Sequence, residues 1–510
     1  MKKFILSSLL ILSITAGSSF AQAAKTAQGA SKSAQVTTTA QKTKAGIEIP
    51  FVTKTLANGL EVIVLPDSSV PIITVEMAVR NGSFTEPPEL NGLSHLYEHM
   101  FFNTNRAIAI FRCDLFTQYR RADLFRSYGC ESQTQYKNEI GDVGYLNKVD
   151  EIGYLRNGTT QEEYVNYFFN MTSSEGNLPT IMRMMRDAML YPSFDEDEFQ
   201  KEVQIVLGEL DRQMSEPAYY LDRTLMDKLF YKYPSRKSPG GTRETVAKAT
   251  TDQMRLIQSR YYIPNNSALI VTGDVQPETV FKLAEELFGV WKRGEDPFKK
   301  YPMVEHPPLP KSEGVIINQD VENVFIQIGW HGPSIGKDDA STYAADVFSF
   351  IVQQPNSRLQ RALVDSGLAV AVSVHYYTQR NVGPIRITLV TSPEKAKEAL
   401  KTLYAEIAQF NNPNYFTDEE LENAKNLLEA EDLFRREKLS EYTHSLGFWW
   451  SSTGIDYFRS YHKKLRAVSR EDIKRYISTY IQNKPHVGVA MLSAADQQKA
   501  KLTESDLIGK

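Results

Sequence analysis

The sequence lacks the features that would place it among membrane-spanning or nucleic-acid-binding proteins. After the N-terminal residues, no run reaches the roughly 18 apolar residues of a transmembrane helix. The formal net charge is only −4, and no stretch gathers Lys and Arg into a basic stripe. We therefore expect neither stable membrane insertion of the mature protein nor nucleic-acid binding.

Cysteine is also scarce. The 510 residues include two cysteines, Cys113 and Cys130, in one short segment. In an oxidising compartment these two could close a small loop as a disulfide, and two free thiols are the alternative. No cysteine lies near the end of the apolar N-terminal run, which argues against a lipid-anchored form.

The N-terminus has the layout of a secretory signal peptide. A basic start, Met1–Lys3, precedes the apolar run Phe4–Ile14, and Ala21–Ala23 forms an A-x-A-like cleavage site. We predict a signal peptide over residues 1–23, with a membrane anchor as the alternative, and a secreted or periplasmic mature protein. Residues 24–46 have almost no large apolar side chains and predict a flexible leader.

Strand and helix patterns begin near residue 47. Strands are predicted at 60–65, 72–79, 164–171 and 267–272, and helices after Gly92 and at 179–190, 195–216 and 276–288. Because the pattern has no regular βαβ rhythm, it favours an α+β layer architecture. We expect an N-terminal domain over 47–290, a linker rich in Gly and Pro over 291–313, and a C-terminal domain over 314–510.

The opening pattern recurs after the linker. Two predicted strands, 314–317 and 324–330, again end at a Gly-containing turn. A long helix predicted at 417–440 begins with the capping box Thr417-x-x-Glu420. This recurrence predicts that the two domains are a diverged duplication.

One short segment carries the candidate chemistry. Between residues 47 and 290 the only histidines are His95 and His99, which form an H-x-x-E-H pattern with Glu98. On a helix the two imidazoles lie one turn apart on one face and can bind one zinc ion, while Glu98 can reach a metal-bound water. Chance is the alternative, since the pattern arises by accident in roughly one such chain in a hundred.

A catalytic zinc site needs a third protein ligand, and the helix predicted at 195–216 offers two candidates. Glu202 and Glu209 lie two turns apart at the edge of its apolar stripe. A carboxylate facing the core is costly unless it is paired or bound to metal. From burial alone, salt bridges at the rim of the core are an equally weighted alternative.

These residues resemble the pitrilysin/insulinase family of zinc metallopeptidases, inverzincins that include the mitochondrial processing peptidase. The matching features are Asn58-Gly59-Leu60, Gly82-Ser83, Glu86 and the run from Gly92 to Phe102. The resemblance covers roughly residues 50–505. It implies an α+β fold of two homologous domains, each a mostly antiparallel sheet covered by helices, which together form a half-clam shell.

The resemblance also implies which residues form the site. The family's third ligand is the later Glu of an E-x6-E pair, which makes Glu209 the ligand of one Zn²⁺ per chain and Glu202 an acid that orients the site. Glu98 would be the general base that acts on a zinc-bound water in the hydrolysis of extended peptides or unfolded segments. The stretch implied to bind the substrate along a sheet edge is Asn157, Gly158, Thr159 and Thr160.

Two features depart from the family pattern. The segment from about 106 to 139, which holds both cysteines, is extra relative to the family's spacing. In the C-terminal domain, Val370 stands where the family has a Tyr that assists the substrate carbonyl, and the expected Arg is missing. The nearby substitutes are Arg361, Tyr376, Tyr377 and Arg380.

The missing Arg and Tyr indicate a partner chain. In split members of the family, one chain carries the zinc motif and another carries the Arg and Tyr. The resemblance therefore implies that this chain is the zinc-bearing subunit of a heterodimer with a homologous partner, with a homodimer as the alternative. The alternative function is a non-catalytic or partner-dependent subunit of a peptidase or chaperone-like assembly.

Overall fold

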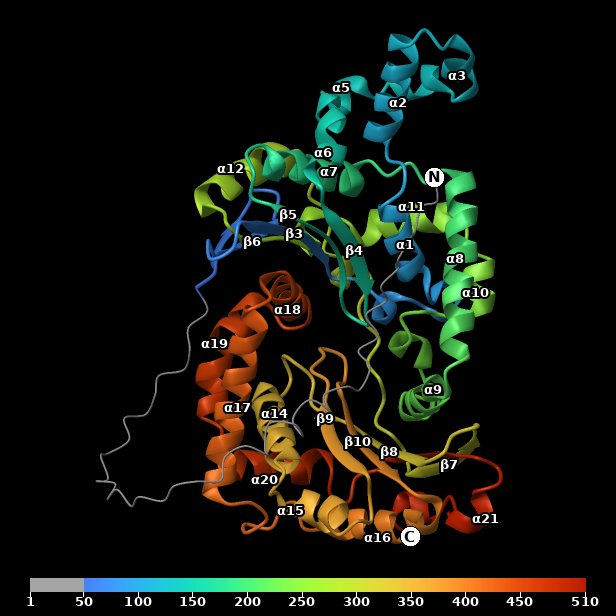
Figure 1. Ribbon diagram of the computed structural model, residues 1–510, viewed down its shortest axis with the longest axis vertical. Helices are drawn as coiled ribbons and strands as arrows, with labels where there is room; N and C mark the ends of the chain where they lie inside the picture. The colour runs from blue at the N-terminus through green and yellow to red at the C-terminus, as the bar shows by residue number, and fades with distance from the viewer. Residues whose placement is uncertain (1–49) are drawn as a thin grey trace, which may run out of the picture. The chain divides into compact units, whose positions relative to one another are not determined.

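The computed structural model describes residues 50–510 (Figure 1). The predicted signal peptide, 1–23, and leader, 24–46, lie outside the described residues. The described chain contains two mostly antiparallel sheets covered by helices, which confirms the α+β prediction. None of the helices in residues 50–510 combines the length and the apolar character needed to span a membrane.

The first sheet has the strand order β1-β2-β6-β3-β5-β4. Its only parallel pair is β2 with β6, and all other neighbours are antiparallel. The predicted strands of this half are present within one or two residues. The strands are β1 (Val52–Thr55), β2 (Glu61–Pro66), β3 (Ile72–Val79), β4 (Leu155–Thr160), β5 (Val165–Thr172) and β6 (Ser267–Gly273).

The second sheet repeats this topology. Its order is β7-β11-β8-β10-β9, with β7 and β11 parallel and all other pairs antiparallel, so only the edge strand β1 has no counterpart. Matching order and strand direction support the duplication that the sequence predicts. The strands are β7 (Glu313–Asn318), β8 (Val324–His331), β9 (Ala371–Tyr376), β10 (Pro384–Thr391) and β11 (Val487–Leu492).

Helices follow the strands in a similar order in the two halves. In the first they are α1 (Leu93–Phe101), α2 (Arg106–Gln118), α3 (Ala122–Ser127), α4 (Cys130–Thr134), α5 (Lys137–Ile140), α6 (Val149–Ile152), α7 (Asn177–Leu190), α8 (Glu196–Met214), α9 (Pro217–Leu229), α10 (Arg243–Ala247), α11 (Thr251–Tyr261) and α12 (Pro277–Phe288). The segment predicted as a linker contains only the single turn α13 (Pro297–Lys300). In the second they are α14 (Asp339–Gln353), α15 (Arg358–Gln360), α16 (Ala396–Ile407), α17 (Asp418–Arg436), α18 (Leu439–Ser452), α19 (Ile455–Arg466), α20 (Arg470–Tyr480) and α21 (Gln497–Ala500).

The helix predicted over 417–440 is shorter than expected. It begins with the predicted capping box of Thr417 and Glu420, but α17 ends at Arg436 and α18 begins at Leu439. The break lets α18 turn back and bury Tyr442, Leu446 and Trp450. Tertiary burial therefore overrides the helical propensity of the residues around the break.

The two halves exchange helices. From the first half, α9 packs on β8 and β11 of the second sheet, where Leu221, Leu225 and Leu229 join one core with Val487 and Val489. From the second half, α18 packs on β3 and β6 of the first sheet. Because other helices cover the opposite faces, β6 and β11 are buried along their whole length and read as continuous apolar runs.

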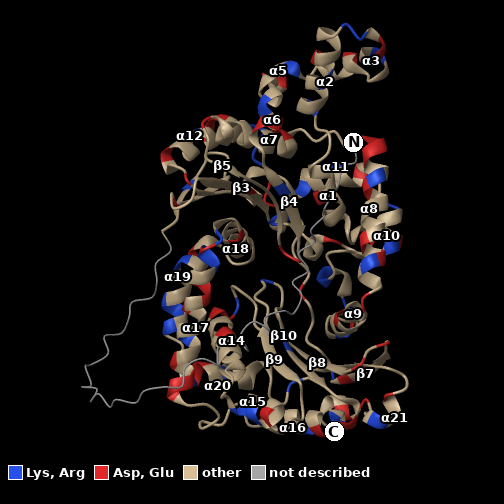
Figure 2. Ribbon diagram, in the orientation of Figure 1, with Lys and Arg blue, Asp and Glu red and all other residues tan. Residues whose placement is uncertain are grey.

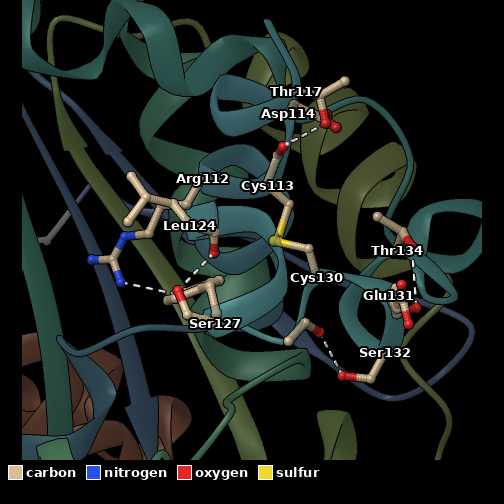
Figure 3. The surroundings of a disulfide bond; sticks show 12 residues. Arg112, Cys113, Asp114, Thr117, Leu124, Ser127, Cys130, Glu131, Ser132 and Thr134 are labelled. Atoms are coloured by element: carbon tan, nitrogen blue, oxygen red, sulfur yellow. Dashed lines mark hydrogen bonds between the residues drawn. A yellow bond between two sulfur atoms is a disulfide. The ribbon is translucent and has the colours of Figure 1, made fainter. Parts of the chain in front are cut away.

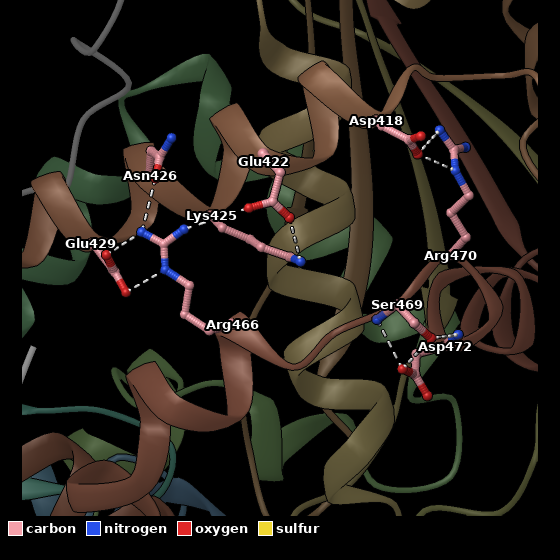
Figure 4. A network of polar contacts seen from close by, with 9 residues as sticks. All are labelled: Asp418, Glu422, Lys425, Asn426, Glu429, Arg466, Ser469, Arg470 and Asp472. Atoms are coloured by element: carbon pink, nitrogen blue, oxygen red, sulfur yellow. Dashed lines mark hydrogen bonds and ion pairs between the residues drawn. The ribbon is translucent and has the colours of Figure 1, made fainter. Parts of the chain in front are cut away.

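Ion pairs join the outer helices of the second half (Figure 4). Arg466 of α19 donates to both carboxylate oxygens of Glu429 on α17, and Arg470 donates to Asp418 at the start of α17 at 2.8 Å. Both acidic and basic residues lie along these helices (Figure 2). This mixed pattern agrees with the absence of a basic stripe in the sequence.

The extra segment forms a small helical unit, α2–α5, closed by a disulfide. Cys113 of α2 and Cys130 of α4 form a disulfide in the structure (Figure 3). Both cysteines are fully buried. The apolar cluster at the base of this unit contains Ala107, Ile110, Ile140 and Val143.

The packing of α18 on the first sheet predicts that a side chain at Gly447 lowers stability. A Cβ there would collide with Glu76 Oε1 of β3 and with Oη of Tyr164, the residue before β5. Gly447→Ala should therefore lower the melting temperature, because overpacking of about 1–3 kcal/mol exceeds the helix-propensity gain of about 1 kcal/mol. The matched control is Gly208→Ala in α8, where a Cβ meets open space and the same gain should raise stability. Equal thermal shifts in the two variants would contradict this packing.

Candidate metal centre

The helix that carries the histidine pair is fixed at its N-terminus by a buried acid. Glu86 accepts hydrogen bonds from the backbone N–H groups of Gly92, at 2.8 Å, and Ser94, at 2.6 Å. These are unpaired donors of the first turn of α1, and a carboxylate there also suits the helix dipole. Gly92 has φ +90° and backs onto Gly240 and Gly241, so a side chain would not fit.

Helix α8 brings the third candidate ligand to this pair. Asp195 caps α8, and its buried stripe packs the helix beside α1. Glu209 Oε2 lies 3.7 Å from His95 Nε2 and 3.5 Å from His99 Nε2. Of the two acids that the sequence singled out, Glu209 therefore faces both histidines.

These three residues fit a zinc ion. Two ligands bound at about 2.0–2.1 Å to a tetrahedral ion lie about 3.4 Å apart, close to the separations observed. Within residues 50–510, His95, His99 and Glu209 are the only set of three or more His, Cys, Asp or Glu whose donor atoms lie within 4.8 Å of one another. Two imidazoles and one carboxylate leave a fourth position for water or substrate.

Glu202 contacts His99 at Nδ1, the ring nitrogen that does not face Glu209. Its Oε2 lies 3.1 Å from His99 Nδ1, and its Oε1 accepts a hydrogen bond from Asn103 Nδ2 at 3.1 Å. In the neutral imidazole, this contact favours the proton on Nδ1 and leaves Nε2 free to bind metal. By contrast, His95 Nδ1 is buried and has no hydrogen-bond partner among the described residues.

The charges around the two histidines differ. Burial, together with the charge of His99, lowers the pKa of His95 to about 4, which favours its neutral, metal-binding form. Burial alone would lower the pKa of His99, but the carboxylates of Glu202 and Glu209 outweigh it and raise that pKa to about 10. His99 must lose this proton to bind a metal.

The candidate base is buried against the edge strand β4. Thr160 Oγ1 donates to Glu98 Oε2 at 3.0 Å, and a Cβ on Gly158 would lie 2.7 Å from Glu98 Oε1. Burial raises the pKa of Glu98 to about 7, a value suited to a group that takes up and releases protons. Gly158 thus gives the carboxylate the space that any side chain would fill.

The predicted substrate residues lie where a peptide could reach them. Asn157 and Thr159 are exposed, and their strand, β4, is the edge of the first sheet. Four further residues were predicted as substitutes for the missing Arg and Tyr, and two of these, Tyr377 and Arg380, contact the turn after β4. Tyr377 Oη donates to Gln161 Oε1 at 2.9 Å, and the Arg380 backbone N–H donates to Glu163 at 2.9 Å.

The other candidates of the second half do not join this contact. Val370 is 65% exposed and Arg361 is exposed, while Tyr376 donates to the Pro333 carbonyl at 3.0 Å. The sequence assigns no role to Asn103 or to Glu86, although Glu86 is among the residues that match the family pattern. The acid that precedes the Gly92 helix was a usable signal for Glu86, but no local pattern identifies Asn103.

Comparison with known proteins gives two family matches. The model described as "Insulinase (Peptidase family M16)" matches residues 62–109 and 135–242, and the model described as "Peptidase M16 inactive domain" matches 248–428. Together they cover more than half of the chain. The chain belongs to the M16, or insulinase, peptidase family. The gap between the two stretches that the insulinase model matches, residues 110–134, falls inside the extra segment.

Individual M16 relatives are distant in sequence. The chain is 24% identical over 374 residues to the uncharacterized zinc protease YmxG of Bacillus subtilis, covering 73% of this chain and 81% of the relative. It is 21% identical over 434 residues to the zinc protease PqqE of Helicobacter pylori, covering 84% and 90%.

Solved structures of M16 peptidases share the fold. A protease from Helicobacter pylori matches with a TM-score of 0.72 at 20% identity, over 88% of this chain and 100% of that one. The first half of the periplasmic protease PqqL from Escherichia coli matches with a TM-score of 0.68 at 17% identity, over 91% and 97%. The expected two-domain α+β fold is confirmed.

The contact between Glu202 and His99 predicts a change in metal affinity. Glu202→Ala should weaken Zn²⁺ binding about 10- to 100-fold, because His99 loses the acid that orients its ring. Competition with a chromogenic chelator measures the Kd. Asp197→Ala is the control, since Asp197 is an exposed acid in the first turn of α8 and does not contact a histidine. Equal losses in both variants would refute an orienting role for Glu202.

Proposed function

We propose that this chain is a zinc-dependent metalloendopeptidase that hydrolyses extended peptides or unfolded segments. The convergence of His95 Nε2, His99 Nε2 and Glu209 Oε2, next to the buried carboxylate of Glu98, carries this proposal. The zinc protease names of the relatives agree with it. One Zn²⁺ per chain would be held by the two histidines and Glu209.

The chain's own residues suit the required proton transfers. A zinc ion at this site would lower the pKa of a water molecule and polarise a peptide carbonyl. Glu98 would accept the water proton at Oε1, the oxygen that Thr160 does not hold, and later donate it to the leaving amine. Thr160 keeps the carboxylate at one rotamer between these two steps.

The substrate would bind as an added strand. At the sheet edge, β4 has unpaired backbone groups on its outer side, and it runs past Glu98 at Gly158 and Thr160. A peptide that pairs with the backbone of Asn157, Gly158 and Thr159 would gain affinity from main-chain hydrogen bonds without demanding one sequence. This mode requires an extended segment, which agrees with a peptide or an unfolded substrate.

The compartment and the partner are part of the same proposal. A secreted or periplasmic location agrees with the bonded Cys113 and Cys130, because disulfides persist in oxidising compartments. The solved neighbour PqqL is itself described as periplasmic. A homologous partner that supplies an Arg and a Tyr agrees with the exposed Val370.

Glu98→Gln separates metal binding from hydrolysis. The variant should keep one Zn²⁺, since Glu98 is not a ligand, but should lose about 10²- to 10⁴-fold in kcat, because the amide cannot accept the proton. Zinc content is measured by atomic absorption, and turnover is measured on a mixed library of short peptides with and without chelator. Glu151→Gln, an exposed acid on α6, is the control and should keep full turnover. Unchanged turnover in Glu98→Gln would refute the role of Glu98 as the general base.

A partner-dependent or non-catalytic subunit is the second candidate function. The observation that favours it is Val370, which stands exposed where a Tyr was expected. The same assay discriminates, if it is run with and without a sister chain encoded nearby. Chelator-sensitive cleavage by the single chain excludes it, cleavage only with the sister chain supports partner dependence, and none in either case supports a non-catalytic subunit.

A further inference from the structure

The edge strand beside the metal centre presents one row of side chains to the catalytic helix. In β4, alternate residues share a face. Thr160 and Gly158 both meet Glu98 of α1, and Arg156, the next residue in this row, lies over the ring of Phe102 directly after α1. The row Arg156–Gly158–Thr160 therefore faces α1, the helix that carries His95, Glu98 and His99, whereas Leu155, Asn157 and Thr159 face the other way.

Arg156 is held in place but is not neutralised. Its guanidinium carbon lies 5.4 Å from the centroid of the Phe102 ring, and Nη1 donates to the Phe102 carbonyl at 3.4 Å. The residue is exposed, and no carboxylate in residues 50–510 forms an ion pair with it. The remaining N–H donors of the guanidinium are thus available to a bound molecule.

We propose that Arg156 is a specificity-determining residue that selects peptides with an Asp or Glu side chain near the scissile bond. This inference rests on the proposed function. In a peptide paired with β4, the residue opposite Gly158 faces Glu98, and the residue two positions along the peptide lies opposite Arg156 on the same face. A carboxylate there can bind the planar guanidinium through two hydrogen bonds. A Lys or Arg at that position would meet a like charge.

The test uses one cleavable parent peptide. Each position within three residues of the scissile bond is replaced in turn by Glu, Gln or Lys, and kcat/KM is measured with the intact zinc-loaded chain. At one position Glu should exceed Lys by about three- to tenfold, as expected for an exposed charge-assisted pair. Arg156→Gln should abolish that ratio, and Arg156→Glu should invert it.

A matched control separates charge recognition from damage to the strand. Leu155→Gln changes a residue of the same strand that is 73% exposed but faces the opposite side, so it should keep the Glu-to-Lys ratio. The ratio in the wild-type chain should also shrink at high salt, because exposed pairs are screened. A ratio near one at every position, or a ratio that survives in Arg156→Gln, overturns the inference.

Binding provides a readout that does not require turnover. Fluorescence anisotropy of the same labelled peptides on the Glu98→Gln variant should show tighter binding of the Glu peptide than of the Lys peptide. The difference should disappear in the Glu98→Gln, Arg156→Gln double variant. Loss of cleavage with this difference intact would refute the peptidase and keep the recognition site, whereas cleavage without the difference would refute the recognition site alone.

Discussion

The mutual burial of α9 and α18 is the constraint on which the rest of the structure depends. Each helix leaves its own half and completes the core beneath the other half's sheet. Neither sheet can bury its apolar face without the other half of the chain, so the two halves must be stabilised together. The central strands β6 and β11 show this, because they are buried from end to end.

The candidate metal centre is further stabilised by contacts at the ends of its two helices. Glu86 fixes the first turn of α1, Asp195 fixes that of α8, and Thr104 joins the two helices through Glu198 at 2.6 and 2.9 Å. Donor atoms from separate helices can bind one ion tightly only if the helices cannot drift apart. The Glu202 contact then sets the orientation of the His99 ring, a finer adjustment than the backbone alone provides.

Much of the fold and most of the candidate site could be predicted from local patterns. The strands from Glu61 to Val79 and the stripe of α8 follow from periodicity, and the His95–His99 pair follows from helical spacing. The choice of Glu209 over Glu202 depended on the family resemblance, because both acids lie on the same edge of α8. The positions of Thr160 and Gly158 against Glu98 depend on strand register across a long insertion, which no local pattern contains. The break after Arg436 was missed because local propensity favours a continuing helix.

The second half, although it matches a model described as an inactive domain, supports the side chains of the candidate site. Its loop after β9 holds the turn between β4 and β5: Tyr377 bonds Gln161 at 2.9 Å, and the backbone of Arg380 bonds Glu163 at 2.9 Å. Glu163 is buried, and the backbone N–H groups of Arg380 and Asn381 donate to its carboxylate, which would otherwise be costly to desolvate. Thr160, the residue before this turn, holds the carboxylate of Glu98. A half that contributes none of the candidate metal ligands thus fixes the strand against which Glu98, the proposed base, is positioned.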